Sequence, residues 1–110
     1  MICDHERIRL ISRNKPDLAR NLIGLFLREL PNIKNEIEQA SAVADAAQLA
    51  ESCHRLKSAL GNFVSPEFYQ EVSALETSAR NQTLTEWRAA WPQTDNKLKQ
   101  LTEELHQMCR

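Results

Sequence analysis

Residues 50–63 read AESCHRLKSALGNF, and this stretch places two different faces on one predicted helix. Side chains three and four positions apart lie on the same side of an α-helix. One face is apolar and runs through Leu49, Cys53, Leu56, Leu60 and Phe63. The other face carries one imidazole and one ammonium among small side chains, at Ala47, Ala50, His54, Lys57, Ser58 and Gly61. The first face is typical of a helix packed on a core, and the second of a helix that offers its histidine to another protein.

The second face resembles a known motif. The run His54-Arg55-Leu56-Lys57-Ser58-Ala59-Leu60-Gly61 is similar to the phospho-acceptor motif, His-x-x-Lys-Gly-(Ser/Ala), of the histidine-containing phosphotransfer (HPt) domains of bacterial phosphorelays. The similarity extends along nearly the whole chain, through Leu25-Phe26-Leu27-Arg28-Glu29-Leu30-Pro31, Asp45 and Leu75-Glu76-Thr77-Ser78-Ala79-Arg80. Two positions depart from the pattern. Ser58 stands where most family members have glycine, and Val64 stands at a position that is often glycine.

The resemblance implies a set of roles. His54 would be the phospho-acceptor, and a polar residue at the position of Glu76 would orient its ring. The partners would be receiver domains of response regulators, and the acceptor aspartate and a Mg²⁺ ion would belong to them, so this chain would carry no cofactor of its own. The resemblance also points to a hybrid sensor kinase as the parent protein.

The chemistry of the residues agrees with these roles. Imidazole is the side chain that is largely neutral, and therefore nucleophilic, near pH 7. Lys57, one turn after His54, and the adjacent Arg55 favour the neutral ring, and the Lys57 ammonium can hydrogen-bond phosphoryl oxygens. Small residues beside the ring would let a partner approach closely. We therefore predict His54 as acceptor, with a phosphate- or partner-binding group made of Ala50, Arg55, Lys57, Ser58 and Gly61.

The whole chain predicts a single all-α domain over residues 1–110, an antiparallel four-helix bundle with an additional short N-terminal helix. That first helix covers about residues 4–13. The second runs from 16 or 17 to 42 and bends at Pro31 without breaking. The third begins after Asp45 and ends near 63 or 64, the fourth begins after Ser65 and ends near 81, and a fifth begins after Thr83, with a kink or break at Pro92. Short connections favour antiparallel neighbours.

Composition excludes several classes of protein. The chain has 14 Lys and Arg against 15 Asp and Glu without a basic stripe, so nucleic acid is not an expected partner. No apolar run approaches the ~20 residues of a membrane span, so we expect no membrane contact. The cysteines at 3, 53 and 109 are widely scattered, which favours free thiols in the cytoplasm over a disulfide or metal site. We expect a monomer, either free or as the cytoplasmic domain of an inner-membrane sensor kinase.

Three functions remain open at the level of sequence. The first is a phosphohistidine carrier between receiver domains, which is not an enzyme in its own right because it lacks a glycine-rich nucleotide loop and a kinase-like acidic cluster. The second is a helical-bundle interaction module whose histidine is not phosphorylated. The third is an enzyme that uses His54 as a general base, although no second catalytic group is paired with it in the sequence. Transfer of phosphate from a phosphorylated receiver domain discriminates among them.

Overall fold

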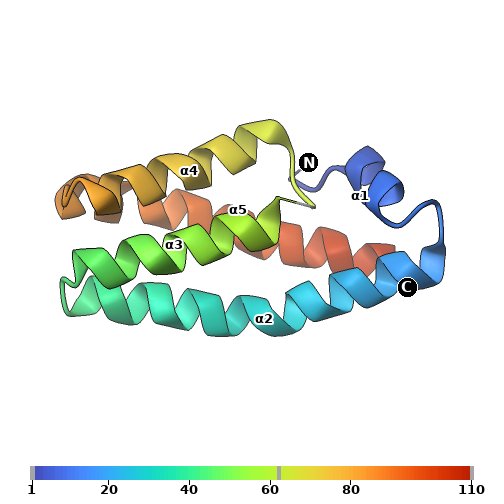
Figure 1. The fold of residues 1–110 in the computed structure, drawn as a ribbon, viewed down its shortest axis with the longest axis horizontal. Coiled ribbons are helices and arrows are strands. Elements are labelled where there is room, and N and C mark those ends of the chain that lie inside the picture. Colours follow the sequence, from blue (N-terminus) through green and yellow to red (C-terminus); the bar gives the residue numbers. More distant parts are fainter. Residues whose placement is uncertain (1, 62, 110) are drawn as a thin grey trace.

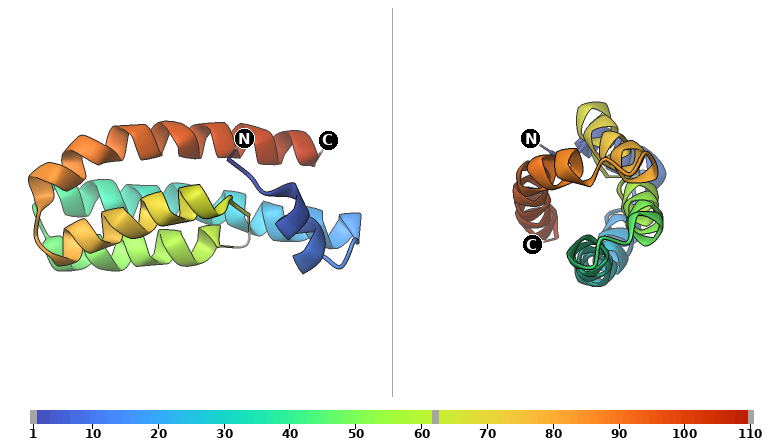
Figure 2. Two further views of the ribbon diagram at one scale, coloured as in Figure 1. Left: turned by 90° about the horizontal axis from the view of Figure 1, so that it is seen from above. Right: turned by 90° about the vertical axis from the view of Figure 1, so that its left-hand side faces the viewer.

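The computed structural model of the chain describes residues 2–61 and 63–109. Within this part the helices are α1 (His5–Ile11), α2 (Pro16–Ala42), α3 (Ala46–Leu60), α4 (Pro66–Arg80) and α5 (Leu84–Met108). Helices α2 to α5 run antiparallel, each packed on the next, and α5 also contacts α2, so the four surround one core (Figures 1 and 2). Helix α1 covers the part of α2 that extends beyond α3 and α4 (Figure 1). The predicted all-α bundle with an additional N-terminal helix is confirmed.

The core is built from the apolar faces that the sequence spacing predicts. On α3, Leu49, Cys53, Leu56 and Leu60 are all fully buried. The rings of Trp87 and Trp91 stack with their centroids 5.3 Å apart. Because burial of each such side chain contributes about 1.5–3 kcal/mol to folding, this apolar face fixes the rotation of α3 and thereby decides which residues face the solvent.

Side-chain caps position three of the helix starts, and at α1 the Asp4 carboxylate accepts from the Arg7 N–H at 3.0 Å. The Asp45 carboxylate accepts a hydrogen bond from a backbone N–H in the first turn of α3, at 3.0 Å, and the Ser65 hydroxyl does the same for α4 at 3.3 Å. Thr83 precedes α5 as predicted, but its hydroxyl donates to the carbonyl oxygen of Ser78, at 2.9 Å. Thr83 therefore binds the end of α4 through both its hydroxyl and its backbone N–H, and it leaves the start of α5 without a side-chain cap.

Helix α3 ends earlier than predicted, at Leu60 and not at Phe63 or Val64. The residues that follow pair with the N-terminal segment: the Asp4 N–H donates to the Phe63 carbonyl oxygen at 2.8 Å, and Cys3 forms an antiparallel β-bridge with Val64. A backbone that pairs with an extended segment cannot also continue the helix. This long-range pairing overrides the local apolar periodicity.

The first helix is also shorter than predicted. It occupies His5–Ile11 and not residues 4–13, because Arg13 and Asn14 adopt left-handed backbone conformations with φ of 54° and 60°. Such conformations end a right-handed helix and turn the chain into α2.

The two prolines predicted to bend helices lie inside continuous helices. Helix α2 continues through Pro31 and α5 through Pro92, so neither proline interrupts its helix. The first turns of α5 are inclined to the rest of that helix (Figure 2), as expected for a proline that removes one backbone hydrogen bond.

Candidate functional site

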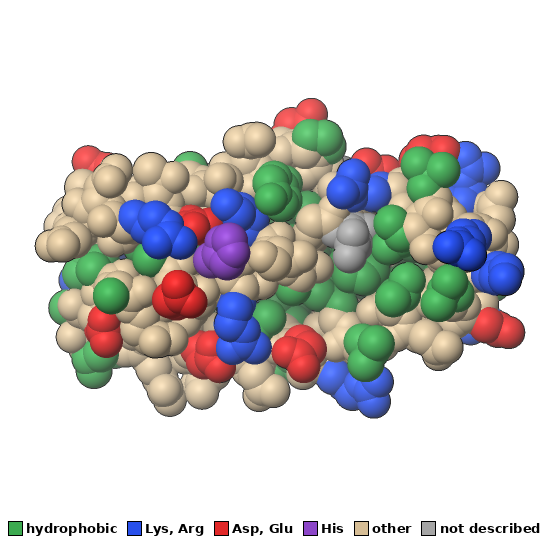
Figure 3. All heavy atoms as spheres, in the orientation of Figure 1, with side chains coloured by type: hydrophobic (Ala, Val, Ile, Leu, Met, Phe, Trp, Pro, Cys, Tyr) green, Lys and Arg blue, Asp and Glu red, His purple; other side chains and the backbone are tan. Residues whose placement is uncertain are grey.

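One face of the bundle shows a histidine side chain among Lys, Arg, Asp and Glu side chains (Figure 3), and His54 lies near the middle of α3. Its neighbours Cys53 and Leu56 are fully buried, and the 100° step between successive residues of a helix therefore turns His54 toward solvent. Its side chain is 52% exposed. A rigid, well-packed helix thus presents a half-exposed imidazole to the surface.

The ring contacts a carboxylate from the next helix. Glu76 lies on α4, antiparallel to α3 and packed against it, and the Nδ1 atom of His54 is 3.3 Å from both Oε1 and Oε2 of that carboxylate. The Glu76 side chain is only 8% exposed. The contact expected from the family resemblance therefore forms, and it joins an accessible ring to a buried acid.

Two cations share the same carboxylate. Lys57 Nζ lies 2.8 Å from Glu76 Oε1, and Arg80 donates to Oε2 from Nε at 2.9 Å and from Nη2 at 2.7 Å. Burial on its own raises the pKa of the Glu76 carboxyl, but hydrogen bonds from Lys57, Arg80 and the imidazole outweigh it and lower the pKa to about 2. Glu76 is therefore ionised at neutral pH.

This ionisation decides the tautomer of the ring. A carboxylate without a proton can only accept hydrogen bonds, so the atom of His54 that faces Glu76 must donate. The proton of the neutral imidazole then resides on Nδ1, and the lone pair resides on Nε2, the ring nitrogen that does not face Glu76. The site therefore holds an oriented nucleophile at the protein surface.

Sequence reasoning gave no role to Arg80, although it quoted the residue in the motif. The signal was available, because residues four apart on a helix are neighbours and Glu76 and Arg80 have the favourable order of acid before base. What the sequence does not reveal is that Glu76 is buried. Because Glu76 is buried, Arg80 is the counter-ion of a desolvated carboxylate and not one half of an ordinary surface ion pair.

Arg55 lies apart from this cluster. Its guanidinium forms ion pairs with Glu36 and, at 3.5 Å, with Glu29, both of them on α2. Arg55 and Lys57 thus point to opposite neighbours of α3, since one pairs with α2 and the other with α4. The two cations, predicted to act together near the phosphate, belong to separate ion-pair groups in the free domain.

The small residues predicted to lie beside the His54 ring are only partly accessible to a partner. Ser58, one turn after His54, is exposed. Ala50 is only 3% exposed and belongs to the core, so its assignment to a partner-binding surface is wrong. Helix α3 packs against both α2 and α4, and the arc that these two neighbours cover is wider than the single apolar face that the sequence predicts.

Gly61 was predicted to lie inside the helix, but it is the C-cap of α3, with an ordinary φ of −55°. A Cβ atom added to it would lie 3.6 Å from Cε2 of Tyr69, an ordinary contact distance. Glycine at this position is therefore required neither by the backbone conformation nor by the immediate packing.

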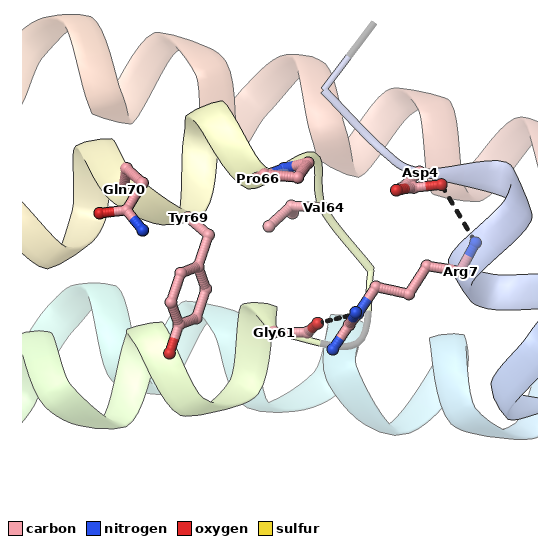
Figure 4. A pocket seen from close by; sticks show the side chains of 7 residues that line it. All are labelled: Asp4, Arg7, Gly61, Val64, Pro66, Tyr69 and Gln70. Atoms are coloured by element: carbon pink, nitrogen blue, oxygen red, sulfur yellow. Dashed lines mark hydrogen bonds between the residues drawn. The ribbon is translucent and has the colours of Figure 1, made fainter.

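A shallow pocket of about 280 Å³ lies beside Gly61, at the end of α3. Its lining comes from the N-terminal segment, the end of α3 and the start of α4 (Figure 4), namely Asp4, Arg7, Gly61, Val64, Pro66, Tyr69 and Gln70. The Arg7 guanidinium donates to the carbonyl oxygen of Gly61, which satisfies a free carbonyl at the C-terminus of α3. Sequence reasoning missed this contact because the two residues are 54 positions apart.

Two other kinds of site are not found in residues 2–61 and 63–109. No group of three or more His, Cys, Asp or Glu side chains there is arranged to hold a metal ion. No helix in the same ranges combines the length and the apolar character needed to cross a membrane.

Comparison with known proteins agrees with this geometry. The family model described as "Hpt domain" matches residues 21–109, a range that contains His54, Glu76 and both cations of the cluster. Searches of curated proteins and of solved structures gave no significant match. A match over most of the chain, together with an exposed histidine on the second of four antiparallel bundle helices, shows that this chain belongs to the Hpt domain family.

Proposed function

We propose that this Hpt domain carries a phosphoryl group on Nε2 of His54, which it takes from the aspartyl phosphate of one receiver domain and passes to the aspartate of another. One observation carries the proposal: the half-exposed ring of His54 has its Nδ1 atom against a buried, ionised carboxylate. That contact fixes the ring orientation and leaves the lone pair on Nε2. A nucleophile held in this way suits phosphoryl transfer, which depends mainly on positioning and on charge neutralisation.

The transfer step balances without a separate acid or base. The Nε2 lone pair attacks the phosphorus atom of the aspartyl phosphate. An N–P bond forms while the P–O bond to the aspartate breaks, and the electron pair of that bond returns to the aspartate as a carboxylate. The ring keeps its Nδ1 proton and gains positive charge, which the Glu76 carboxylate stabilises from 3.3 Å. The reverse step regenerates the neutral ring.

Lys57 supplies positive charge on the side of the phosphoryl group. It lies one helical turn after His54, and its flexible four-carbon stem lets the ammonium move from Glu76 to phosphoryl oxygens. The acceptor aspartate and a Mg²⁺ ion are expected on the receiver domain, which neutralises the remaining charge. The chain itself therefore needs no cofactor for this role.

The phosphoryl donor is a protein and not ATP. The whole chain contains only two glycines, Gly24 and Gly61, and so cannot form the glycine-rich loop that commonly holds nucleotide phosphates.

Cys3 and Cys53 are buried free thiols, which suits a protein that functions in the reducing cytoplasm.

The experiment that tests this proposal is a transfer assay. The chain is mixed with a receiver domain that carries ³²P-labelled aspartyl phosphate, and with labelled ATP in a parallel sample. Label should move from the receiver onto an acid-labile, base-stable site, and none should come from ATP. His54→Gln should abolish labelling, while the matched variants His5→Gln and His106→Gln, at exposed histidines on α1 and α5, should be labelled like the wild type.

The outcome separates this function from the alternatives. A wild-type chain that binds receivers without taking up label would be an interaction module, and the carrier function would be wrong. Label that persists in His54→Gln but is lost in His5→Gln or His106→Gln would move the acceptor to another histidine.

A further inference from the structure

The two oxygens of Glu76 divide the cations of the site between them. Lys57 binds Oε1 at 2.8 Å, and the two donors of Arg80 both bind Oε2, at 2.9 and 2.7 Å. The exposure of the three side chains differs greatly: 8% for Glu76, 20% for Lys57 and 52% for Arg80. One buried negative charge thus has two positive partners, one semi-buried and one at the surface.

In the free domain this arrangement holds more positive charge than one carboxylate requires. A phosphoryl group on the ring brings about two negative charges to within reach of Lys57. An ammonium is a compact point charge on a flexible stem, so Lys57 can turn from Glu76 to the new oxygens. A buried carboxylate that loses its only counter-ion is strongly disfavoured. Without a second cation on Glu76, Lys57 would therefore stay on Glu76 and could not turn to the phosphoryl oxygens.

Arg80 is suited to remain on Glu76. It lies on the same helix, four residues later, and its guanidinium approaches a single oxygen with two donors. A planar guanidinium loses little further freedom when it forms such paired hydrogen bonds. Both donors are directed at the oxygen opposite the one that Lys57 binds, so Lys57 can leave without disturbing them.

We propose that Arg80 is a positioning residue for phosphoryl transfer: it is the fixed counter-ion that keeps Glu76 against the ring of His54 and thereby frees Lys57 to bind the phosphoryl group. This inference rests on the proposed carrier function and deepens it. In the free domain Lys57 and Arg80 both neutralise Glu76, and in the loaded domain Arg80 does so alone while Lys57 neutralises the phosphoryl oxygens.

The test is a double-mutant cycle with Lys57→Ala and Arg80→Gln, measured as the rate at which phosphoramidate loads the full chain. Phosphoramidate is a small donor, so altered receiver docking does not enter the result. Without Arg80, Lys57 stays on Glu76, so the removal of Lys57 should slow loading less. If Lys57→Ala slows loading by about tenfold in the wild-type background, the same change should slow Arg80→Gln by about threefold or less, since non-additivity reports coupling between sites.

Two further variants and two NMR readouts exclude a merely structural role. Arg80→Lys keeps a charge on Glu76 and should restore most of the Lys57 effect. Arg20 forms an exposed ion pair with Asp17 of the same helix. Arg20→Gln removes this pair and should leave the Lys57 effect unchanged. In the unphosphorylated chain, ¹³C NMR of the Glu76 carboxyl should show its pKa rising from about 2 toward the ordinary value in Arg80→Gln, and ¹⁵N NMR should show a smaller share of the Nδ1–H tautomer.

The results separate the two levels of the argument. A wild-type chain that accepts phosphate from neither receivers nor phosphoramidate overturns the carrier function and this inference with it. A wild-type chain that loads normally, with Lys57→Ala and Arg80→Gln slowing the reaction independently of each other, overturns only the counter-ion role of Arg80. An unchanged Glu76 titration in Arg80→Gln overturns it as well.

Discussion

Glu76→Gln should reveal how strongly the buried carboxylate contributes to the fold, through a difference in stability that depends on pH. The substitution keeps the shape of the side chain and removes its charge. In the wild type this charge accepts hydrogen bonds from Lys57, Arg80 and His54, and the pKa of the carboxyl falls from an ordinary 4.5 to about 2. Because the side chain is only 8% exposed, solvent does little to screen these interactions.

The size of the effect follows from the two pKa values. A carboxyl whose pKa is lower in the folded state stabilises the fold fully above its unfolded value, and this stabilisation is lost as the pH falls through the folded value. A shift from 4.5 to about 2, at about 1.4 kcal/mol per unit, corresponds to about 3 kcal/mol. Integrated over the titration, about 2 kcal/mol of this disappears between pH 5 and pH 3.

Urea denaturation followed by circular dichroism at 222 nm, at pH 7, 5, 4 and 3, measures this quantity for the wild type and for Glu76→Gln. The difference in unfolding free energy between the two proteins should be constant from pH 7 to 5 and should then shrink by about 2 kcal/mol toward pH 3. Glu104, whose pKa is also lowered, is common to both proteins and cancels. A difference that stays constant down to pH 3 would show that the cations do not hold Glu76 ionised, and the tautomer assigned to His54 would lose its basis.

Three further predictions test the core, the approach to the ring and the charge beside it. Leu56→Ala should lower the unfolding free energy by about 2–5 kcal/mol, since Leu56 is fully buried; urea denaturation at pH 7 measures it, and a loss below about 0.5 kcal/mol would mean that α3 faces the other way. Ser58→Leu should slow transfer from a receiver domain but not from phosphoramidate, because it adds bulk beside His54 without touching the ring; equal slowing with both donors would point to a distorted histidine. Lys57→Ala should slow loading by roughly tenfold, the low end for a charged hydrogen bond of about 1.5–3 kcal/mol, and Lys57→Arg should recover only part of it; wild-type rates in Lys57→Ala would remove Lys57 from the mechanism.

The local elements of the fold could be predicted because their causes are local. The spacing of Leu49, Cys53, Leu56 and Leu60 defines one face of a helix, and these four side chains are indeed buried. Asp45 and Ser65 cap the helices that follow them, as their sequence context predicts. Where the predicted end of α3 was wrong, a distant segment intervened: the N-terminal residues pair with residues 63–65 and end α3 at Leu60.

The site divides in the same way. The position of His54 opposite the apolar face of its own helix follows from a helical period of 3.6 residues, so the sequence identifies an exposed histidine with Lys57 one turn away. The burial of Ala50 does not follow from that period, because two neighbouring helices cover more of α3 than its apolar face suggests.

By itself, then, the sequence determined the helices, the apolar face of α3 and the exposed histidine with its nearby lysine, because these depend on residues within a few turns of one another. Only the tertiary structure decided the electrostatics of the site. The antiparallel packing of α4 on α3 brings Glu76 to His54 across 22 positions of sequence and buries its carboxylate. Burial is what makes Lys57 and Arg80 counter-ions and assigns the proton of the ring to Nδ1, because a desolvated charge must be neutralised by the groups that the fold places around it.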